Sequence, residues 1–358
     1  MRGLLLAGGH GTRLRPLTFT GNKHMIPIAN RPMLHYGLRL LQEAGIREVG
    51  IILGPITEGI REGIGDGHEF GLKVTYLTQG DPKGLAHAVL VAREFLGDEP
   101  FLMVLGDNLL EGGAGPYLEA FRTGRPSAVV GAVPVRDPGR YGVVELGPEG
   151  QILSLEEKPK APRSNLALIG VYLFTPEVHD VIRELKPSAR GELEITDAIR
   201  TLNERTARVK VVRLSGWWKD TGQVEDILEA NERVLASRAE PFFELRGTVR
   251  PGAHLIGHVA LGEGSVVESG VTIRGPAVLG QGVRVENGAY IGPFVAVGDR
   301  CVVRQAEVDR SILMDDVVLD LPTRVVDSII GRGSRLTERT ERPKGQSFVI
   351  GDSSRVTL

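Results

Sequence analysis

Residues 3–16 read GLLLAGGHGTRLRP, and this stretch determines how the first part of the chain folds. Its beginning, Gly3–Leu6, is a continuous apolar run, which is typical of a strand buried on both faces of a parallel sheet. The glycines after it, Gly8, Gly9 and Gly11, let the backbone turn sharply and approach a ligand closely. Their N–H groups can converge on an anion, to which Arg13 adds a positive charge. The stretch therefore predicts a buried strand that runs into an anion-binding turn.

Three interpretations of this turn compete. A P-loop needs a lysine followed by Ser or Thr after the last glycine, and Thr12-Arg13 does not supply it. A dinucleotide-binding fingerprint needs a third glycine where Leu14 stands, and an acidic residue about 20 positions on. No acidic residue occurs between Met25 and Gln42. A purely structural glycine turn stays open from the loop alone.

Short apolar runs alternate with helical patterns from Met1 to about Ala236. The predicted strands are Gly3–Leu6, Val49–Leu53, Val74–Thr78, Phe101–Leu105, Ala128–Val133, Ala167–Phe174 and Val209–Leu214. The predicted helices are Met33–Ala44, Leu85–Leu96, Pro116–Phe121, Pro176–Leu185 and Val224–Leu235. This alternation predicts an α/β, Rossmann-like fold with a mixed, mostly parallel sheet and helices on both faces. Ligands of such sheets bind beyond the carboxyl ends of the strands, which directs attention to the loops after Leu6, Gln79 and Leu105.

A period of six replaces this pattern from about Val249. The in-phase apolar positions are Val249, Leu255, Leu261, Val267, Ile273, Leu279, Val285, Ile291, Val297 and Val303. Such a repeat predicts a left-handed parallel β-helix, with these residues stacked inward along one corner. The phase breaks at Asp309, after which we expect coils with insertions. The predicted domains are 1–240 and 247–358, with the boundary in Ser237–Arg246.

The composition indicates a globular protein and excludes several classes. Of 358 residues, 41% are hydrophobic and 25% charged, and the formal charge is −2, so we expect neither a nucleic-acid nor a membrane partner. No apolar run reaches the roughly 18 residues of a membrane span, and the N-terminus lacks the features of a secretion signal, so we expect a cytoplasmic location. The single cysteine, Cys301, excludes an internal disulfide and a cysteine-rich zinc site.

Several segments together resemble the sugar nucleotidyltransferases. They are LAGGHGTRLRPLTFTGNKHMIPIANRPML (6–34), TQGDPKGLAHAV (78–89), VLGDN (104–108), YGVVEL (141–146), LEEKP (155–159), KPSARGELEITD (186–197) and WWKDTG (217–222). Their order and spacing are most similar to the glucose-1-phosphate thymidylyltransferases, in the longer subgroup that carries a trailing six-residue repeat. The resemblance implies an Mg²⁺-dependent enzyme that forms dTDP-glucose and pyrophosphate from dTTP and glucose 1-phosphate.

The resemblance also assigns roles to residues. Nucleotide binding falls to Leu6, Ala7, Gly8, Gly9, Gly11, Thr12, Arg13, Gln79, Gly84 and Asp107. Sugar-phosphate binding falls to Tyr141, Gly142, Glu157, Lys158, Arg190 and Trp218. Arg13 and Lys23 are the candidate catalytic residues, since cations suit the triphosphate and the leaving pyrophosphate. Asp107 and Asp220 are the candidate Mg²⁺ ligands, since Mg²⁺ favours oxygen donors and substrate phosphates.

Structural roles are the alternatives for each group. Arg13 and Lys23 can be solvated surface cations, Asp107 can cap a turn, and Asp220 can cap the helix that begins near Gln223. EEKP can be an exposed charged turn, and Trp218 can be a core aromatic residue.

Two polar side chains within the motifs call for separate comment. The Gln79 amide donates and accepts hydrogen bonds, which matches the edge shared by thymine and uracil, so UTP is an alternative to dTTP. His24 stands where many relatives carry glutamine, and we expect its charge to depend on pH.

Other functions stay open. Six-residue repeats also occur in acyltransferases, where His254 or His258 would act as general base. A non-catalytic regulatory subunit is a further alternative, although the candidate catalytic residues are all present. The exposed ends and flat faces of a β-helix predict a homo-oligomer.

Overall fold

The structure of the protein is a computed structural model that describes residues 1–237 and 244–338. The chain divides into two compact units. The sheet unit comprises Met1–His10, Thr20–Met25 and Met33–Asp220. The β-helix unit comprises Gly11–Phe19, Ile26–Pro32 and the described part of Thr221–Leu358. The predicted domain bounds, 1–240 and 247–358, stay a prediction, because residues 238–243 and 339–358 lie outside the described residues.

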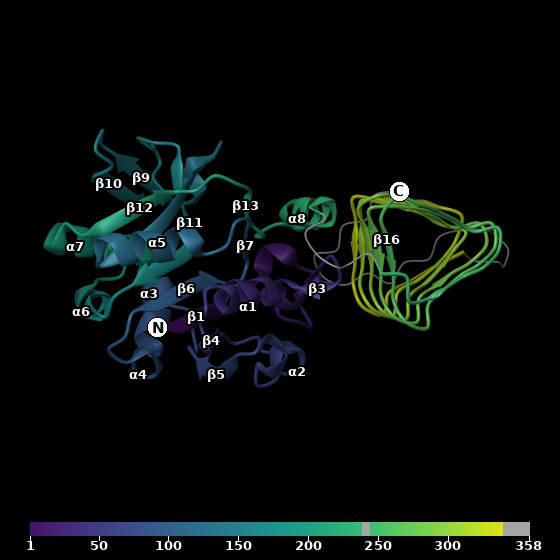
Figure 1. The fold of residues 1–358 in the computed structure, drawn as a ribbon, viewed down its shortest axis with the longest axis horizontal. Coiled ribbons are helices and arrows are strands. Elements are labelled where there is room, and N and C mark those ends of the chain that lie inside the picture. The colour runs from purple at the N-terminus through teal and green to yellow at the C-terminus, as the bar shows by residue number, and fades with distance from the viewer. Residues whose placement is uncertain (238–243, 339–358) are drawn as a thin grey trace. The chain divides into compact units, whose positions relative to one another are not determined.

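The sheet unit is built on a nine-stranded mixed sheet (Figure 1). Its strands are β1 (Arg2–Ala7), β4 (Glu48–Leu53), β5 (Lys73–Thr78), β6 (Phe101–Leu105), β8 (Ala128–Pro134), β9 (Gly142–Leu146), β10 (Ile152–Glu157), β11 (Leu166–Phe174) and β12 (Val209–Arg213). The order is β10-β9-β11-β6-β1-β4-β5, and β8 and β12 continue from β11. Strands β6, β1, β4 and β5 are parallel, whereas β11 is antiparallel to β6, β8 and β9.

Helices cover both faces of this sheet, as predicted. One core cluster joins Leu5 and Ala7 of β1 to α1 (Met33–Glu43), α2 (Ile60–Ile64) and α5 (Gly115–Gly124). The other joins Leu4 and Leu6 to α3 (Leu85–Val91), α4 (Arg93–Leu96), α6 (Glu177–Glu184) and α7 (Ile195–Thr206). Successive side chains of a strand point to opposite faces, so residues 4–7 of β1 have to be apolar on both sides of the sheet.

The structure adds elements that the sequence pattern did not predict. The helix predicted over Leu85–Leu96 is divided at Ala92 into α3 and α4, and α7 was not predicted. A two-stranded antiparallel ladder joins β7 (Asn108–Leu110) to β13 (Trp218–Asp220). Three-residue strands are too short to show an alternating pattern.

A topological switch point lies between β1 and β6. The chain proceeds from β1 to β4 and β5 on one side and then returns to β6 on the other side of β1. The loops after β1 and β6 therefore diverge from neighbouring strand ends, which is where sheets of this kind bind ligands. The loops after Leu6 and Leu105, selected from the sequence, begin at this point.

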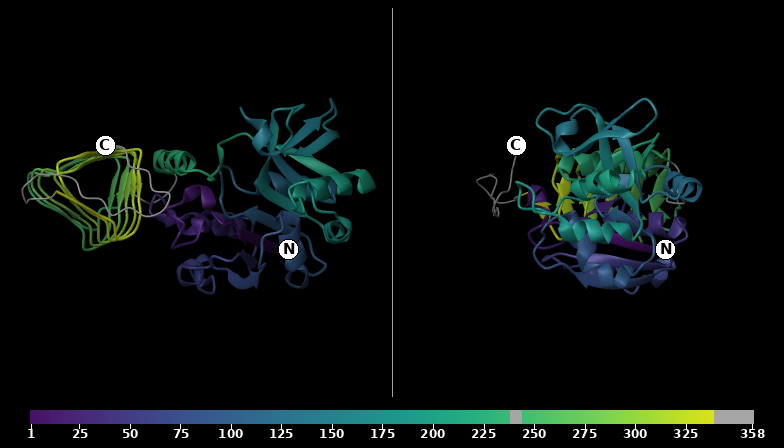
Figure 2. Two further views of the ribbon diagram at one scale, coloured as in Figure 1. Left: turned by 180° about the vertical axis from the view of Figure 1, so that it is seen from behind. Right: turned by 90° about the vertical axis from the view of Figure 1, so that its left-hand side faces the viewer.

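Three parallel sheets form the β-helix, as predicted. The first sheet contains β14 (Thr248–Val249), β17 (Val266–Val267), β20 (Arg284–Val285), β23 (Val302–Arg304), β26 (Val318–Asp320) and β29 (Arg335–Thr337). The second contains β15 (His254–Ile256), β18 (Thr272–Arg274), β21 (Tyr290–Ile291), β24 (Glu307–Asp309) and β27 (Arg324–Val326). The third contains β16 (Val259–Leu261), β19 (Ala277–Leu279), β22 (Val295–Val297), β25 (Ile312–Leu313) and β28 (Ile329–Ile330). The left view of Figure 2 shows the triangular outline of the stacked coils.

The in-phase apolar residues do not line one corner, so that expectation was wrong. Val249 pairs with Val267, and Leu255 pairs with Ile273 in a different sheet. Each coil uses three repeats, one for each sheet, because every third in-phase position returns to the same face. Beyond the phase break the coils shorten instead of gaining insertions, since Val303 pairs with Leu319.

A helix and a hairpin are bonded to the β-helix within the same unit. Besides the coils, the β-helix unit contains helix α8 (Val224–Ala236), the hairpin of β2 (Pro27–Ile28) and β3 (Arg31–Pro32), and η1 (Thr12–Leu14). Asn231 of α8 accepts from Ala29 N–H (2.9 Å) and donates to the Phe294 carbonyl (2.9 Å). Asn30 donates to the Val297 carbonyl (2.6 Å). Among the described residues, no helix is long and apolar enough to cross a membrane.

Candidate active site

The end of β1 is tied to its neighbours at the switch point. Gly106 N–H, after β6, donates to the Leu6 carbonyl (2.9 Å). The buried Asn22 amide donates to the carbonyls of Ala7 (3.3 Å) and Ile56 (2.6 Å). These bonds hold together the starting points of the two diverging loops.

Lys23 and Asp107 form an ion pair at this point. Lys23 lies in η2 (Lys23–Met25), and its side chain runs across Gly9, where an added Cβ would be 3.0 Å from the lysine Cε. Both side chains are largely buried, at 11% and 17% exposed, and Asn108 donates to Asp107 Oδ1 (3.0 Å). Burial would raise the pKa of Asp107, but the charge and hydrogen bond of Lys23 and the Asn108 amide hold it well below its usual range. Asp107 is therefore a carboxylate at neutral pH.

His24 is buried behind this pair, which contradicts the expectation of a pH-dependent charge. Its ring Nδ1 and its backbone N–H both contact Asn22 Oδ1, at 2.7 and 2.9 Å. Burial and the neighbouring Lys23 lower the pKa of His24 to about 3, so the ring is neutral at physiological pH. Because Asn22 Oδ1 can only accept, His24 carries its proton on Nδ1.

Asp220 lies on the strand next to Asp107. The register of β13 and β7 places Asp220 opposite Asn108, the residue after Asp107, although the two aspartates are far apart in sequence. Burial raises the pKa of Tyr172, and the charges of Glu157, Asp107 and Asp220 raise it further. The three carboxylates therefore lie within electrostatic range of one phenol.

These two aspartates fit the chemistry of Mg²⁺. Both supply oxygen donors, and the ammonium of Lys23 on Asp107 shows that this carboxylate accepts a cation. The described part of the chain contains no group of three or more His, Cys, Asp or Glu side chains that could hold a metal ion. A pair of carboxylates suits Mg²⁺, which usually retains waters and substrate phosphates in its shell.

The segment after β5 faces the glycine turn. Gln79 Oε1 would lie 3.0 Å from a Cβ added to Gly8, and Gln79 Nε2 donates to the Gly84 carbonyl (3.2 Å). Gly84 has a φ of 100°, and an added Cβ would lie 2.4 Å from the Leu193 carbonyl oxygen. Glycine is thus required where two predicted motifs, residues 78–89 and 186–197, meet.

A second cluster gathers predicted sugar-site residues. Glu157 ends β10 and accepts from the Thr196 hydroxyl (2.6 Å) and from Arg190 (3.4 Å). A Cβ added to Gly142 would lie 2.7 Å from the Thr196 hydroxyl oxygen, so glycine is needed there. Lys158 follows at φ 44°, with its Nζ 3.9 Å from Glu157 Oε1.

Aromatic side chains connect the two clusters. Trp218 Nε1 donates to Asn108 Oδ1 (2.7 Å), and its ring meets Tyr141 edge-on at 5.3 Å between centroids. Asn108 Oδ1 also accepts from Gly170 N–H (3.0 Å). Asn108 thus joins Asp107 to Trp218.

Arg13 belongs to the β-helix unit. It lies in η1, after Gly11 at φ 61°, together with Thr12. A Cβ added to Gly222 would lie 3.1 Å from an Arg13 Nη atom, so the guanidinium lies against Gly222, two residues after Asp220 in sequence.

The predicted residues within the sheet unit therefore fall into two connected clusters, around Asp107 and around Glu157. At the start of α8, Gln223 N–H donates to the Asp226 carboxylate (3.1 Å). Sequence reasoning missed Asn108, Thr196 and His87. All three are polar residues inside the quoted motifs, which is the signal that could have identified them.

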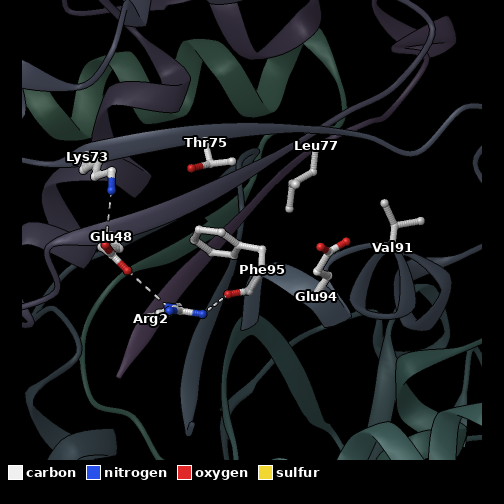
Figure 3. A pocket seen from close by; sticks show the side chains of 8 residues that line it. All are labelled: Arg2, Glu48, Lys73, Thr75, Leu77, Val91, Glu94 and Phe95. Carbon is white, nitrogen blue, oxygen red and sulfur yellow. Dashed lines mark hydrogen bonds and ion pairs between the residues drawn. The ribbon is translucent and has the colours of Figure 1, made fainter. Parts of the chain in front are cut away.

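A separate pocket of about 460 Å³ lies at the opposite end of the strands (Figure 3). Arg2, Glu48 and Lys73 begin β1, β4 and β5 and form a chain of ion pairs along it, and Phe95 of α4 lines it. Because this is the amino end of the parallel strands, the pocket is distinct from the candidate active site.

The chain belongs to the nucleotidyl transferase family. The model of that family matches residues 2–237, and the model of the GMPPB C-terminal domain matches residues 273–357. The predicted relationship to the glucose-1-phosphate thymidylyltransferases is confirmed as well. The protein of that name from Streptomyces antibioticus is 45% identical over 100% of this chain and 99% of its own length.

Other relatives carry different names. The low-salt glycan biosynthesis nucleotidyltransferase Agl11 of Haloferax volcanii is 43% identical over the full length of both chains. The crystal structure of a putative glucose-1-phosphate thymidylyltransferase from Bacillus anthracis, in complex with a sucrose, matches with a TM-score of 0.62 and 38% identity, over 67% of this chain and 96% of that one. UDP-glucose pyrophosphorylase complexed with UDP-glucose matches with a TM-score of 0.59 and 30% identity, over 66% and 99%.

Proposed function

We propose that this protein is a sugar-1-phosphate nucleotidyltransferase that forms dTDP-glucose and pyrophosphate from dTTP and glucose 1-phosphate. One observation carries the proposal: Lys23 and Asp107 meet at the switch point of the sheet, with Asp220 on the adjoining strand. The full-length relatives named as glucose-1-phosphate thymidylyltransferases support this choice of substrates.

The reaction joins two anions. A phosphate oxygen of the sugar phosphate attacks the α-phosphorus of the triphosphate, and pyrophosphate leaves. Catalysis then consists of alignment and charge neutralisation, with no covalent enzyme intermediate. Lys23 neutralises charge on the triphosphate as a point cation, and Arg13 does so through its planar fork. The backbone of Leu6, Ala7, Gly8, Gly9, Gly11 and Thr12 lies against the nucleotide.

Asp107 and Asp220 hold Mg²⁺ in this proposal. Bound there, the ion would polarise the α-phosphate and supply positive charge to the reacting phosphates. Asn108 orients Asp107 through the hydrogen bond at 3.0 Å. Lys23, which pairs with Asp107 in this structure, would be available to a phosphate oxygen if that carboxylate held the ion.

The cluster around Glu157 receives the sugar phosphate. Lys158 and Arg190 bind the phosphate, and Glu157 accepts hydrogen bonds from sugar hydroxyls. Tyr141 and Trp218 form the wall against the ring, and Gly142 allows the sugar to approach the backbone. The bonds to Thr196 and Arg190 hold Glu157 in one orientation.

UTP is the second candidate nucleotide. Gln79 and Gly84 read the base, and the edge of thymine that they face is shared by uracil. The similarity to UDP-glucose pyrophosphorylase favours this alternative. A missing methyl contact costs only about 1–3 kcal/mol, so both nucleotides can be used.

A matrix of nucleoside triphosphates against sugar 1-phosphates, with pyrophosphate release measured with and without Mg²⁺, tests the proposal. We expect the highest rate with dTTP and glucose 1-phosphate, and none after chelation. Asp107→Asn should lower kcat by about 10²–10³-fold, because it removes one of the two carboxylates proposed to hold the metal ion. Asp98→Asn, at an exposed ion pair with Arg93, is the control. Near-normal turnover by Asp107→Asn would remove the metal assignment.

We do not expect the β-helix to catalyse acyl transfer through His254 or His258. Acetyl-CoA consumption in the same reactions would contradict this expectation.

We propose that the protein forms a homo-oligomer through the flat faces of the β-helix, and that it is cytoplasmic. Light scattering that shows only a monomer at micromolar concentration would contradict the homo-oligomer.

A further inference from the structure

The orientation of the Gln79 side chain is set by two neighbours. Its Nε2 donates to the Gly84 carbonyl (3.2 Å) and lies 3.1 Å from His87 Nδ1. Its Oε1 is on the other side, toward Gly8, 3.0 Å from the position of an added Cβ. The amide thus presents its oxygen to the turn that we propose binds the nucleotide.

The hydrogen-bond partners of Gln79 determine which end of its amide is nitrogen and which is oxygen. The Gly84 carbonyl can only accept a hydrogen bond, so the nitrogen of Gln79 has to face it. The second hydrogen of that nitrogen then points at His87 Nδ1, which has to be unprotonated. Burial and the nearby Lys83 lower the pKa of His87, which favours the neutral ring. The contact of its Nδ1 with the Gln79 nitrogen then places the ring proton on Nε2.

We propose that His87 is a positioning residue that sets base specificity by holding Gln79 with its amide oxygen toward the base. The inference rests on the proposed function, because it assumes that a nucleotide base meets Gln79. In this orientation the site offers an acceptor, which suits the N3–H donor of thymine or uracil. Cytosine carries an acceptor at N3, so its lone pair would face the lone pairs of Gln79 Oε1 and the two would repel.

Rotation of the amide would reverse this preference. It would turn Nε2 toward the base, where it could donate to cytosine N3, and Oε1 toward the Gly84 carbonyl. His87 opposes the rotation because its Nδ1 accepts only from the nitrogen end. Gly84 opposes it too, so loss of His87 should weaken the preference without abolishing it.

The experiment compares dTTP with dCTP in the full-length protein. We would measure kcat/KM with glucose 1-phosphate, together with the dissociation constant of each nucleotide by titration calorimetry. His87→Leu removes the acceptor, and His87→Asn retains an acceptor near the Nδ1 position. His68→Leu, at an exposed histidine, is the matched control.

We expect His87→Leu to lower the dTTP:dCTP preference by about 10-fold, the worth of one oriented hydrogen bond, mainly through KM. His87→Asn should retain most of the preference. In a Gln79→Ala background, His87→Leu should leave the ratio unchanged, because no amide remains to orient.

Two results would overturn the inference. One is an unchanged dTTP:dCTP ratio in a folded His87→Leu protein, with both nucleotides weakened equally. The other is the same shift of the ratio with and without Gln79. If His87→Leu does not fold, His87→Asn provides the test. A dTTP:dCTP ratio in His87→Asn as low as that of Gln79→Ala would also contradict the inference. If the proposed function is wrong, the unsubstituted protein will release no pyrophosphate. The ratio of the dTTP and dCTP dissociation constants would still test the role of His87.

Discussion

Asn108 on β7 lies directly opposite Asp220 on β13, and its amide also bonds to Asp107. Asn108 is therefore bonded to one of the two carboxylates that we propose bind the metal ion, and it pairs across the ladder with the residue that carries the other. The same carboxamide oxygen accepts from Trp218 and Gly170, so the metal site and the sugar wall share one support.

Asn108→Ala should destabilise the protein by about 2–4 kcal/mol, because Gly170 N–H and Trp218 Nε1 lose their acceptor in buried surroundings. Urea unfolding measures this loss. Asn165→Ala is the control, since Asn165 is exposed and alanine retains the backbone carbonyl that accepts from Val135 N–H. A loss below about 0.5 kcal/mol would show that Asn108 supports nothing.

Thr196→Val should raise the KM for glucose 1-phosphate about fivefold and leave the KM for dTTP unchanged. The reason is that Glu157 loses the hydroxyl donor at 2.6 Å and becomes free to reorient. Steady-state kinetics with each substrate varied in turn measures the difference. Thr201→Val, on the same helix α7, is the control. An equal rise in both KM values would contradict the assignment of Glu157 to the sugar.

His179→Phe should reduce the loss of stability on acidification. His179 is buried on α6 and stacks on Phe101, with burial and then Arg93 and Arg183 lowering its pKa from 6.5 to about 4. As the pH falls below 6.5, the unfolded chain binds a proton that the folded ring does not, so stability present above pH 6.5 is lost toward pH 4.

By pH 5 this loss amounts to about 2 kcal/mol, and His179→Phe should avoid it. Unfolding measured at pH 7.5 and pH 5 tests the difference. Phe101→Leu is the control, since it should weaken the protein by similar amounts at both values. Equal pH slopes for His179→Phe and the unsubstituted protein would contradict the prediction.

Tyr117→Phe should leave the unfolding free energy unchanged or raise it by about 1 kcal/mol. The Tyr117 hydroxyl is fully buried without a hydrogen-bond partner among the described residues, so its removal ends a desolvation cost. A Cβ added to Gly131 would lie 1.9 Å from this hydroxyl, so Gly131→Ala should destabilise strongly, and less so beside Tyr117→Phe. Independent, additive effects of the two substitutions would refute this contact.

The sequence predicts best what burial imposes on a long segment. Residues 4–7 of strand β1 are all apolar because both faces are covered there, and the six-residue repeat persists because each coil stacks on the next. The clustering of motif residues also follows, since strand ends of a parallel sheet meet at one edge.

Short and non-local features leave no such pattern. Strands β7 and β13 have three residues each, and their pairing, which brings Asp220 to Asn108, depends on contacts made far along the chain. The neutral state of His24 depends on burial that no local pattern shows. Helix α8 is bonded to the hairpin and to the β-helix through the Asn231 side chain, which accepts from Ala29 N–H and donates to the Phe294 carbonyl, and no local pattern shows such contacts.

The bonds of Asn30 and Asn231 have a consequence for anyone who wishes to shorten this protein. A stop codon after residue 237 would delete the acceptors at Val297 and Phe294 and strip two carboxamides of their coil partners. The solenoid therefore cannot be removed without cost to the remaining residues. A truncated form would need new side chains at positions 30 and 231 before α8 could pack stably.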